Sequence, residues 1–184
     1  MKTATQLEEI LFDDPALTTY ALLDGASIPD LLEYLDSLQP EHVCLYRGEL
    51  KAGVEEVAPY LVQLEEGHAF TRWLLDKGWG EHYGVFAQST APITVVRLHL
   101  RRSLRVYTEE GKGLLFRYYD PRVLRVFLPT MTSEEAQAFF GPIQAFLSEA
   151  EDTSQILRFL RKEGAAVAES RPLAGPDGWQ RVSG

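Results

Sequence analysis

Arginine side chains are the groups in this sequence best suited to chemistry with another molecule. Eight of the 18 Lys and Arg residues lie between Arg97 and Arg125 together with only three acids, so this segment carries a net charge of +5. The rest of the chain carries −14, which gives the total of −9. Guanidinium groups bind carboxylates and carbonyl oxygens through planar, paired N–H donors. The charge segregation therefore predicts a cationic surface, on an acidic body, that binds an acidic or polar partner.

Spacing and composition define a candidate binding set within this segment. Residues 97, 101 and 105 fall four apart, so a helix would place these arginines on one face. Tyrosine and arginine, which protein interfaces concentrate, follow in the motif Phe-Arg-Tyr-Tyr-Asp-Pro-Arg at residues 116–122. We predict that a protein partner binds to seven residues, namely Arg97, Arg101, Arg105, Arg117, Tyr118, Tyr119 and Arg122. The sequence leaves one alternative open, in which Arg101, Arg102 and Arg105 form a solvated helix face. In that alternative Arg117 and Arg122 pair with acids of the chain, including Asp120.

Two acids could serve an enzyme. Asp24 follows a predicted strand and Asp120 precedes a predicted helix. A small hydrolase or transferase that uses one of these strand-end or helix-start aspartates is the alternative function. A turn or a helix cap explains both acids without catalysis, because aspartate is favoured in that geometry alone. We therefore predict no catalytic residues and a protein that is not an enzyme.

Other reactive groups give no signal for a metal, a cofactor or a nucleophile. Gly78-Trp79-Gly80 lacks the lysine-serine pair of a phosphate loop. The single cysteine, Cys44, lies in an apolar run that is typical of a buried strand, so we predict a structural role for it. The four histidines show no metal-ligand spacing: they are His42, His68, His82 and His99. We predict no cofactor and no metal.

Alternating apolar runs and amphipathic segments predict the elements that position these residues. Strands are expected at residues 19–23, 43–46, 60–64, 83–87 and 143–147, and a β-hairpin at 106–108 and 114–118. Helical spacing of apolar residues predicts helices at 5–12, 28–38, 70–75, 93–103, 122–128, 133–140 and 156–162. Asp120 is the expected N-cap of the helix at 122–128, and Pro121 occupies its first position.

The order of these elements predicts an α/β fold in which helices flank a mixed sheet, with a small, mostly helical C-terminal lobe. We expect an α/β domain at residues 1–130 and the lobe at 131–163. Residues 164–184 are rich in Ala, Gly, Pro and Ser, which predicts a flexible tail.

Composition narrows the class of protein. The chain has 184 residues, of which 45 % are hydrophobic, and this is enough for a compact core. No window approaches the roughly 18 consecutive apolar residues of a membrane span, and the first residues lack the apolar centre of a secretion signal. A pI near 5.0 disfavours a protein that binds nucleic acid. We expect a cytoplasmic protein that binds neither membranes nor nucleic acid.

The order of segments resembles the bacterial type VI secretion adaptor family, whose members, called Tap or Tec proteins, are effector chaperones. The resemblance covers roughly residues 20–147, and Phe-Arg-Tyr-Tyr-Asp-Pro-Arg is its most specific part. Other matching segments are Tyr-Ala-Leu-Leu-Asp-Gly-Ala at 20–26, Ala-Pro-Tyr-Leu-Val at 58–62, Trp-Leu-Leu at 73–75, Gly-Trp-Gly at 78–80 and the arginine block at 98–105. The resemblance implies a non-enzymatic cytoplasmic protein that binds one toxic effector. It also implies that the protein helps to load this effector onto the spike, formed by VgrG or a PAAR-bearing protein.

Overall fold

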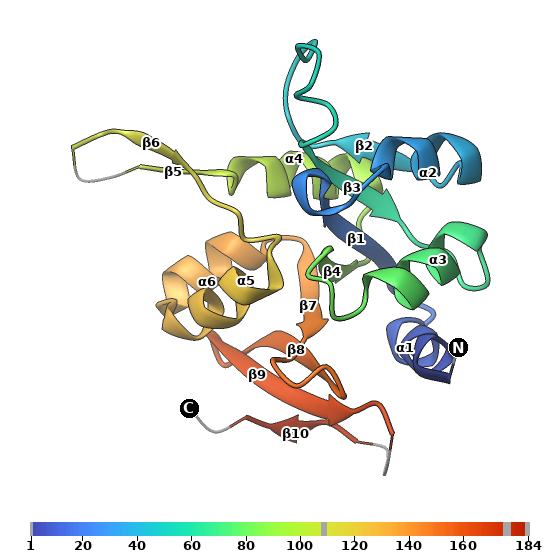
Figure 1. Ribbon diagram of the computed structural model, residues 1–184. Helices are drawn as coiled ribbons and strands as arrows, with labels where there is room; N and C mark the ends of the chain where they lie inside the picture. The colour runs from blue at the N-terminus through green and yellow to red at the C-terminus, as the bar shows by residue number, and fades with distance from the viewer. Residues whose placement is uncertain (1, 108–109, 175–177, 183–184) are drawn as a thin grey trace.

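A single eight-stranded sheet forms the centre of the computed structural model, which describes residues 2–107, 110–174 and 178–182 (Figure 1). Every neighbouring pair of its strands is antiparallel. Across the sheet the strands run in the order β10 (Gln180–Arg181), β9 (Ala165–Pro172), β8 (Gln155–Lys162), β7 (Ile143–Glu149), β4 (Gly84–Ser89), β1 (Thr18–Asp24), β3 (Pro59–Gln63) and β2 (His42–Cys44).

Helices cover both faces of the sheet. Because side chains alternate along a strand, Ala21 and Leu23 of β1 face one layer of helices, and Tyr20 and Leu22 face the other. The first layer contains α1 (Lys2–Leu11), α2 (Leu31–Leu38) and α3 (Ala69–Gly78). The second contains α4 (Ile93–Arg102), α5 (Pro121–Phe127) and α6 (Ser133–Phe140). Two short 3₁₀ turns, η1 (Gly25–Ser27) and η2 (Leu128–Thr130), follow β1 and α5.

Local capping signals determine where the helices of the second layer begin. Asp120 is the N-cap of α5 and accepts a hydrogen bond from the backbone N–H of Arg122 at 2.9 Å, which confirms the prediction from sequence. The α6 helix begins with a capping box, in which Thr132 and Glu135 each accept a bond from the other's backbone N–H. These caps place the Phe-Arg-Tyr-Tyr-Asp-Pro-Arg motif immediately before α5.

The C-terminal third differs from the prediction. Residues 156–162, predicted as a helix, belong to the strand β8. Apolar residues at 156, 159 and 160 have helical spacing, but helices cover both faces of this sheet, so its strands need no strict alternation. The lobe predicted to be mostly helical contains α6, and then β7 and β8 extend the main sheet. The sheet predicted to be mixed is antiparallel in all its strand pairs.

The predicted tail also contains strands. β9 pairs with β8 along its whole length, and β10 pairs with β9. Residues 175–177, 183 and 184 of that segment lie outside the described part of the chain. The proposed domain boundaries at residues 130 and 163 stay predictions, although the sheet continues across both.

A separate hairpin projects from the body beside α4 (Figure 1). Its strands β5 (Arg105–Tyr107) and β6 (Gly113–Leu115) form a two-stranded antiparallel sheet, as predicted. Residue 108, which was assigned to the first strand, and residue 109 lie outside the described residues. Within the described part of the chain, no helix has both the length and the apolar character needed to cross a membrane.

Candidate partner-binding surface

Asp24 lies at the end of β1, where the chain turns into η1. The residue is 1 % exposed, and its side chain accepts a hydrogen bond from the Ser27 hydroxyl at 2.9 Å. The same carboxylate oxygen forms an ion pair with the Arg117 guanidinium. The residue after Asp24 must be a glycine, because a Cβ at Gly25 would collide with the backbone of residues 56 and 58. Asp24 therefore joins the end of β1 to the segment before α5.

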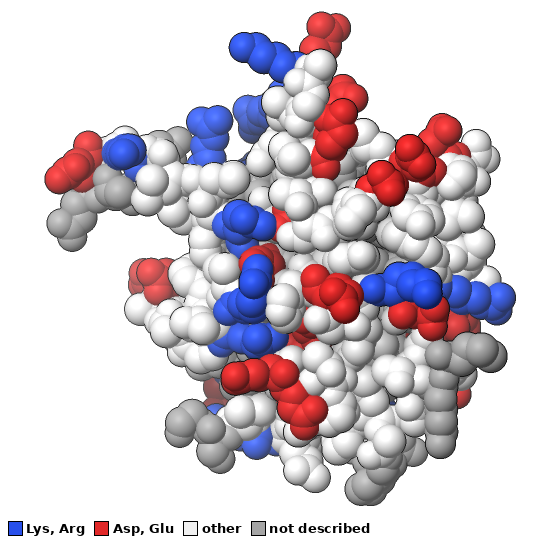
Figure 2. All heavy atoms as spheres, in the orientation of Figure 1, with Lys and Arg blue, Asp and Glu red and all other residues white. Residues whose placement is uncertain are grey.

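Asp120 holds a second arginine. Arg122 donates to its two carboxylate oxygens from Nε at 3.0 Å and from Nη2 at 2.7 Å. Burial would raise the pKa of Asp120, but the hydrogen bonds and charge of Arg122 outweigh it and lower the pKa below its ordinary value. Figure 2 shows a column of Lys and Arg atoms with Asp and Glu atoms directly beside it. The alternative in which Arg117 and Arg122 pair with acids of the chain is thus confirmed for both.

Tyr118 and Tyr119 are core residues, with exposed fractions of 0 % and 1 %. The Tyr118 hydroxyl donates to the carbonyl of Leu100 at 2.8 Å, and its ring packs edge-on against Phe139. Burial raises the pKa of both phenols well above the ordinary value. Neither tyrosine is accessible to a partner in this structure, so they do not belong to a binding surface. Their packing instead fixes the segment that carries Arg117 and Arg122.

Arg101 also has an internal role. Its Nε donates to the carbonyl of Leu45 at 2.8 Å, and its Nη2 donates to those of Cys44 and Tyr46 at 3.2 and 2.9 Å. These carbonyls lie at the end of β2, the edge strand of the sheet. Arg101 therefore fastens α4 to the sheet edge.

The remaining two arginines of the predicted set are differently placed. The α4 helix ends at Arg102, and Arg105 begins β5, so the predicted helix face contains Arg97 and Arg101 but not Arg105. Arg105 is exposed. The Nε atom of Arg97 is buried and has no hydrogen-bond partner among the described residues.

Exposed apolar side chains adjoin these arginines, and sequence reasoning missed them. Val95 and Leu98 of α4 are 46 % and 56 % exposed, and the hairpin exposes further large apolar residues. Their signal was present in the sequence, because both depart from the apolar spacing at 93, 96, 100 and 104 that marks the buried face. We call this region the α4–hairpin surface, which consists of Val95, Arg97, Leu98, Arg102, Arg105, Val106, Leu114 and Leu115.

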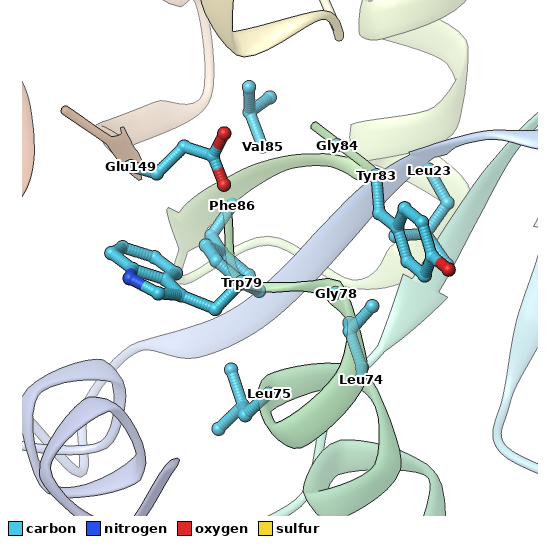
Figure 3. Close-up of a pocket in the computed structure, with 10 residues that line it drawn as sticks. All are labelled: Leu23, Leu74, Leu75, Gly78, Trp79, Tyr83, Gly84, Val85, Phe86 and Glu149. Carbon is cyan, nitrogen blue, oxygen red and sulfur yellow. The ribbon is translucent and has the colours of Figure 1, made fainter. Parts of the chain in front are cut away.

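A small hollow between α3 and β4 has too little room for a ligand. It lies beside Trp79 and Glu149 (Figure 3) and offers about 10 Å³ to a water-sized sphere, room for roughly one water. Glu149 is itself engaged, since it accepts a bond from the Gly80 N–H at 2.6 Å and pairs with His82. Two wider hollows, of about 480 and 460 Å³, lie elsewhere. Neither Asp24 nor Asp120 lines any of the three.

Comparison with known proteins assigns a family. The model of a family described as a domain of unknown function, DUF4123, matches residues 19–138. The chain belongs to the DUF4123 family. Neither the curated proteins nor the solved structures gave a match.

The DUF4123 match begins in β1 and ends within α6. It includes both aspartate–arginine pairs and the whole α4–hairpin surface. The strands β7, β8, β9 and β10 lie beyond it, yet β7 pairs directly with β4 of the matched region. The DUF4123 region of this chain is therefore completed by C-terminal strands that the family model does not cover.

Proposed function

We propose that this DUF4123 protein is an adaptor that binds another polypeptide on its α4–hairpin surface. The hairpin is the observation that carries the proposal. Leu114 and Leu115 are successive residues of β6, so they point to opposite faces, and they are 45 % and 52 % exposed. An isolated two-stranded hairpin is marginally stable in water, and exposed apolar side chains on both of its faces favour a partner that covers them.

In this proposal the arginines of the α4–hairpin surface form a polar rim around its exposed apolar side chains. Arg102 and Arg105 are exposed, and no ion pair joins either of them to another described residue. The rest of the chain carries a net charge of −14, so acids of the protein itself could have paired with these arginines. Exposed arginines beside apolar anchors are typical of protein interfaces.

The partner that the resemblance supports is a toxic effector of the type VI secretion system. In this proposal the protein acts in the cytoplasm, binds one effector without chemical change, and helps to deliver it to the VgrG or PAAR spike. Asp24 and Asp120, the residues of the hydrolase or transferase alternative, act here as a turn cap and a helix cap that hold arginines. No contact of either acid favours that alternative.

Co-purification tests the proposal. The tagged protein is co-expressed with each candidate effector encoded beside its gene, and the bound effector is quantified. Leu98→Asp combined with Leu115→Asp is expected to weaken capture at least tenfold, because each apolar anchor contributes roughly 1–4 kcal/mol of binding. Val182→Asp is the matched control, since Val182 is 41 % exposed and follows β10 at the opposite edge of the sheet.

Thermal melting must first show that both variants fold. Equal capture by wild type, control and a folded double variant would remove the α4–hairpin surface from the interface. Absence of any effector in the wild-type eluate would contradict the adaptor function itself.

A further inference from the structure

The hollow of about 460 Å³ lies on the sheet face that packs against α1. Its floor includes Gln88 of β4, Ala145 of β7 and Leu160 of β8, which are direct neighbours across the sheet. The segment 13–17, which joins α1 to β1, forms one wall. Pockets that bind small ligands usually measure about 300–1,000 Å³. The hollow is therefore large enough for a small molecule or for one long side chain.

Gln88 presents a fixed hydrogen-bond acceptor to this hollow. The residue is 5 % exposed, and its side-chain Nε2 donates to the carbonyl of Leu11 at 3.0 Å. The reverse orientation of the amide would place two oxygen atoms together, so Oε1 must face away from Leu11. Oε1 accepts no hydrogen bond from a described residue and is not sealed from solvent. A molecule in the hollow would satisfy this oxygen if it supplied an N–H donor.

Two carboxylates lie at the wall of the hollow, those of Asp13 and Asp14. Both residues are exposed, and neither forms an ion pair with another described residue. Asp14 accepts a hydrogen bond from the backbone N–H of Ala16 at 2.9 Å, which fixes its position in the turn before β1. The wall beside the Gln88 acceptor is therefore negatively charged.

Arg158 carries the only positive charge among the described residues that line the hollow, and this charge is already balanced. Its Nε and Nη2 donate to Glu169 Oε2 at 3.2 and 2.7 Å. The centre of its guanidinium group lies 4.0 Å from the centre of the Trp179 ring. These contacts occupy Arg158, so it does not neutralise the two aspartates. The charge of the hollow therefore favours a cationic ligand.

The donors and apolar groups indicate which cation fits. Three acceptors, the Gln88 carbonyl and the two carboxylates, require a ligand with several N–H donors. A guanidinium group has five in one plane, whereas an ammonium group has three. Pro15 and Leu160 supply apolar contacts for an aliphatic chain. A metal ion fits less well, because within the described residues no group of three or more His, Cys, Asp or Glu could hold one.

We propose that this hollow binds a guanidinium group on a short aliphatic chain, contributed by an arginine side chain of another polypeptide or by a small molecule. The guanidinium group lies between Gln88 Oε1 and the carboxylates of Asp13 and Asp14, and its aliphatic chain lies against Leu160. The site is on the opposite face of the sheet from α4, so it does not depend on the adaptor function.

NMR titration of the isotope-labelled full chain tests the proposal. The probes are propylguanidinium, the peptide acetyl-Gly-Arg-Gly-amide, and the same peptide with citrulline, which has the shape of arginine without its charge. The side-chain amide signal of Gln88, assigned with Gln88→Met, reports binding. We expect a saturable shift with both guanidinium probes. The citrulline peptide should bind at least about tenfold more weakly, because its hydrogen bonds to the carboxylates lack the positive charge.

Two double variants locate the site. Asp13→Asn with Asp14→Asn keeps the acceptor that holds Ala16 and should weaken binding of both guanidinium probes at least about tenfold. Glu33→Gln with Asp36→Asn removes the same charge from exposed positions of α2 that line none of the three hollows, and should leave binding unchanged. Equal loss in the two double variants would overturn the proposal, because binding would then follow the net charge of the protein.

Other outcomes also decide the proposal. No saturable shift with either guanidinium probe, equal binding of the citrulline peptide, or unchanged binding by the Asp13 and Asp14 variant would each overturn it. Tighter binding of Ca²⁺ than of either guanidinium probe would overturn it in favour of a metal site. Tighter binding of the arginine peptide than of propylguanidinium supports an arginine of a polypeptide as the ligand, and the reverse order supports a small molecule.

Discussion

At the scale of single residues, the arginines of this chain fall into two groups. One group is satisfied internally: Arg117 and Arg122 pair with buried carboxylates, and Arg101 holds backbone carbonyls. The other group, which includes Arg102 and Arg105, forms no ion pair within the described residues. An arginine side chain is thus available to a partner only where it does not already bind a carboxylate or carbonyl of the protein itself.

Removal of Arg101 should destabilise the protein. Arg101→Ala leaves the carbonyls of residues 44–46 without their donors, so the free energy of unfolding should fall by about 1–3 kcal/mol. Urea denaturation measures the change. Arg102→Ala is the control, because Arg102 lies next to it on the exposed side of α4 and should change stability by less than about 0.5 kcal/mol. Equal stability of the two variants would show that the carbonyl contacts contribute nothing.

Acid should unfold the protein through its paired carboxylates. Hydrogen bonds from arginine or lysine leave the pKa of Asp120 and that of Glu169 lowered despite burial, which opposes them. A lowered folded-state pKa adds stability that is present above the unfolded value and is lost as pH falls through the folded value. Unfolding free energy should therefore decline below about pH 4. Asp120→Asn, which keeps the cap but not the charge, should reduce the slope, and an unchanged slope would contradict this assignment.

At the scale of elements, sequence periodicity predicted six helices and the strands β1 to β7 close to where they lie. These segments carry caps or turns that act locally, such as Asp120-Pro121. Contacts between distant residues were not predictable: Arg117 and Asp24 are 93 positions apart, and Arg101 and Leu45 are 56 apart. For the same reason β8 was mistaken for a helix, since only its pairing with β7 and β9 determines its conformation.

The end of α6 requires a glycine. Gly141 has φ of +50° and an added Cβ would collide with the His99 ring, which binds the carbonyl of Phe139 at 2.7 Å. Gly141→Ala should lower the unfolding free energy by about 2–4 kcal/mol, from backbone strain and from the displaced ring. Gly111→Ala is the control for backbone strain alone, because Gly111 has φ of +77° and open space around it. This variant should lower the unfolding free energy by about 1 kcal/mol. Similar melting temperatures for the two variants would refute the collision.

At the scale of the whole molecule, one sheet joins the N-terminal and C-terminal parts. β9 lies beside β8, whose Phe159 is buried in the core of the α4, α5 and α6 face, and Leu173 is buried against the opposite core. The sequence indicated the cationic segment, but it could not show that Tyr118 and Tyr119 are buried. It also could not show that Val95 and Leu98 stay exposed, because exposure depends on which face of α4 meets the sheet.

Truncation tests this continuity. A protein that ends at residue 163 loses β9 and β10 and leaves one edge and part of both cores uncovered. We expect it to lose cooperative thermal unfolding, or to melt at least about 10 °C lower, because several buried apolar side chains lose their contacts. A truncated protein with the wild-type melting temperature would show instead that residues 164–184 are a dispensable tail.

The most direct test of the central claim is hydrogen exchange of the protein with and without its co-purified effector. Slower exchange on binding is predicted for the backbone amides of residues 94–106 and 113–116, which contain the residues of the α4–hairpin surface. Residues 165–172 and 180–182 at the opposite edge should exchange at the same rate in both states. Protection confined to that opposite edge, or no protection anywhere in a complex that stays intact, would contradict the account.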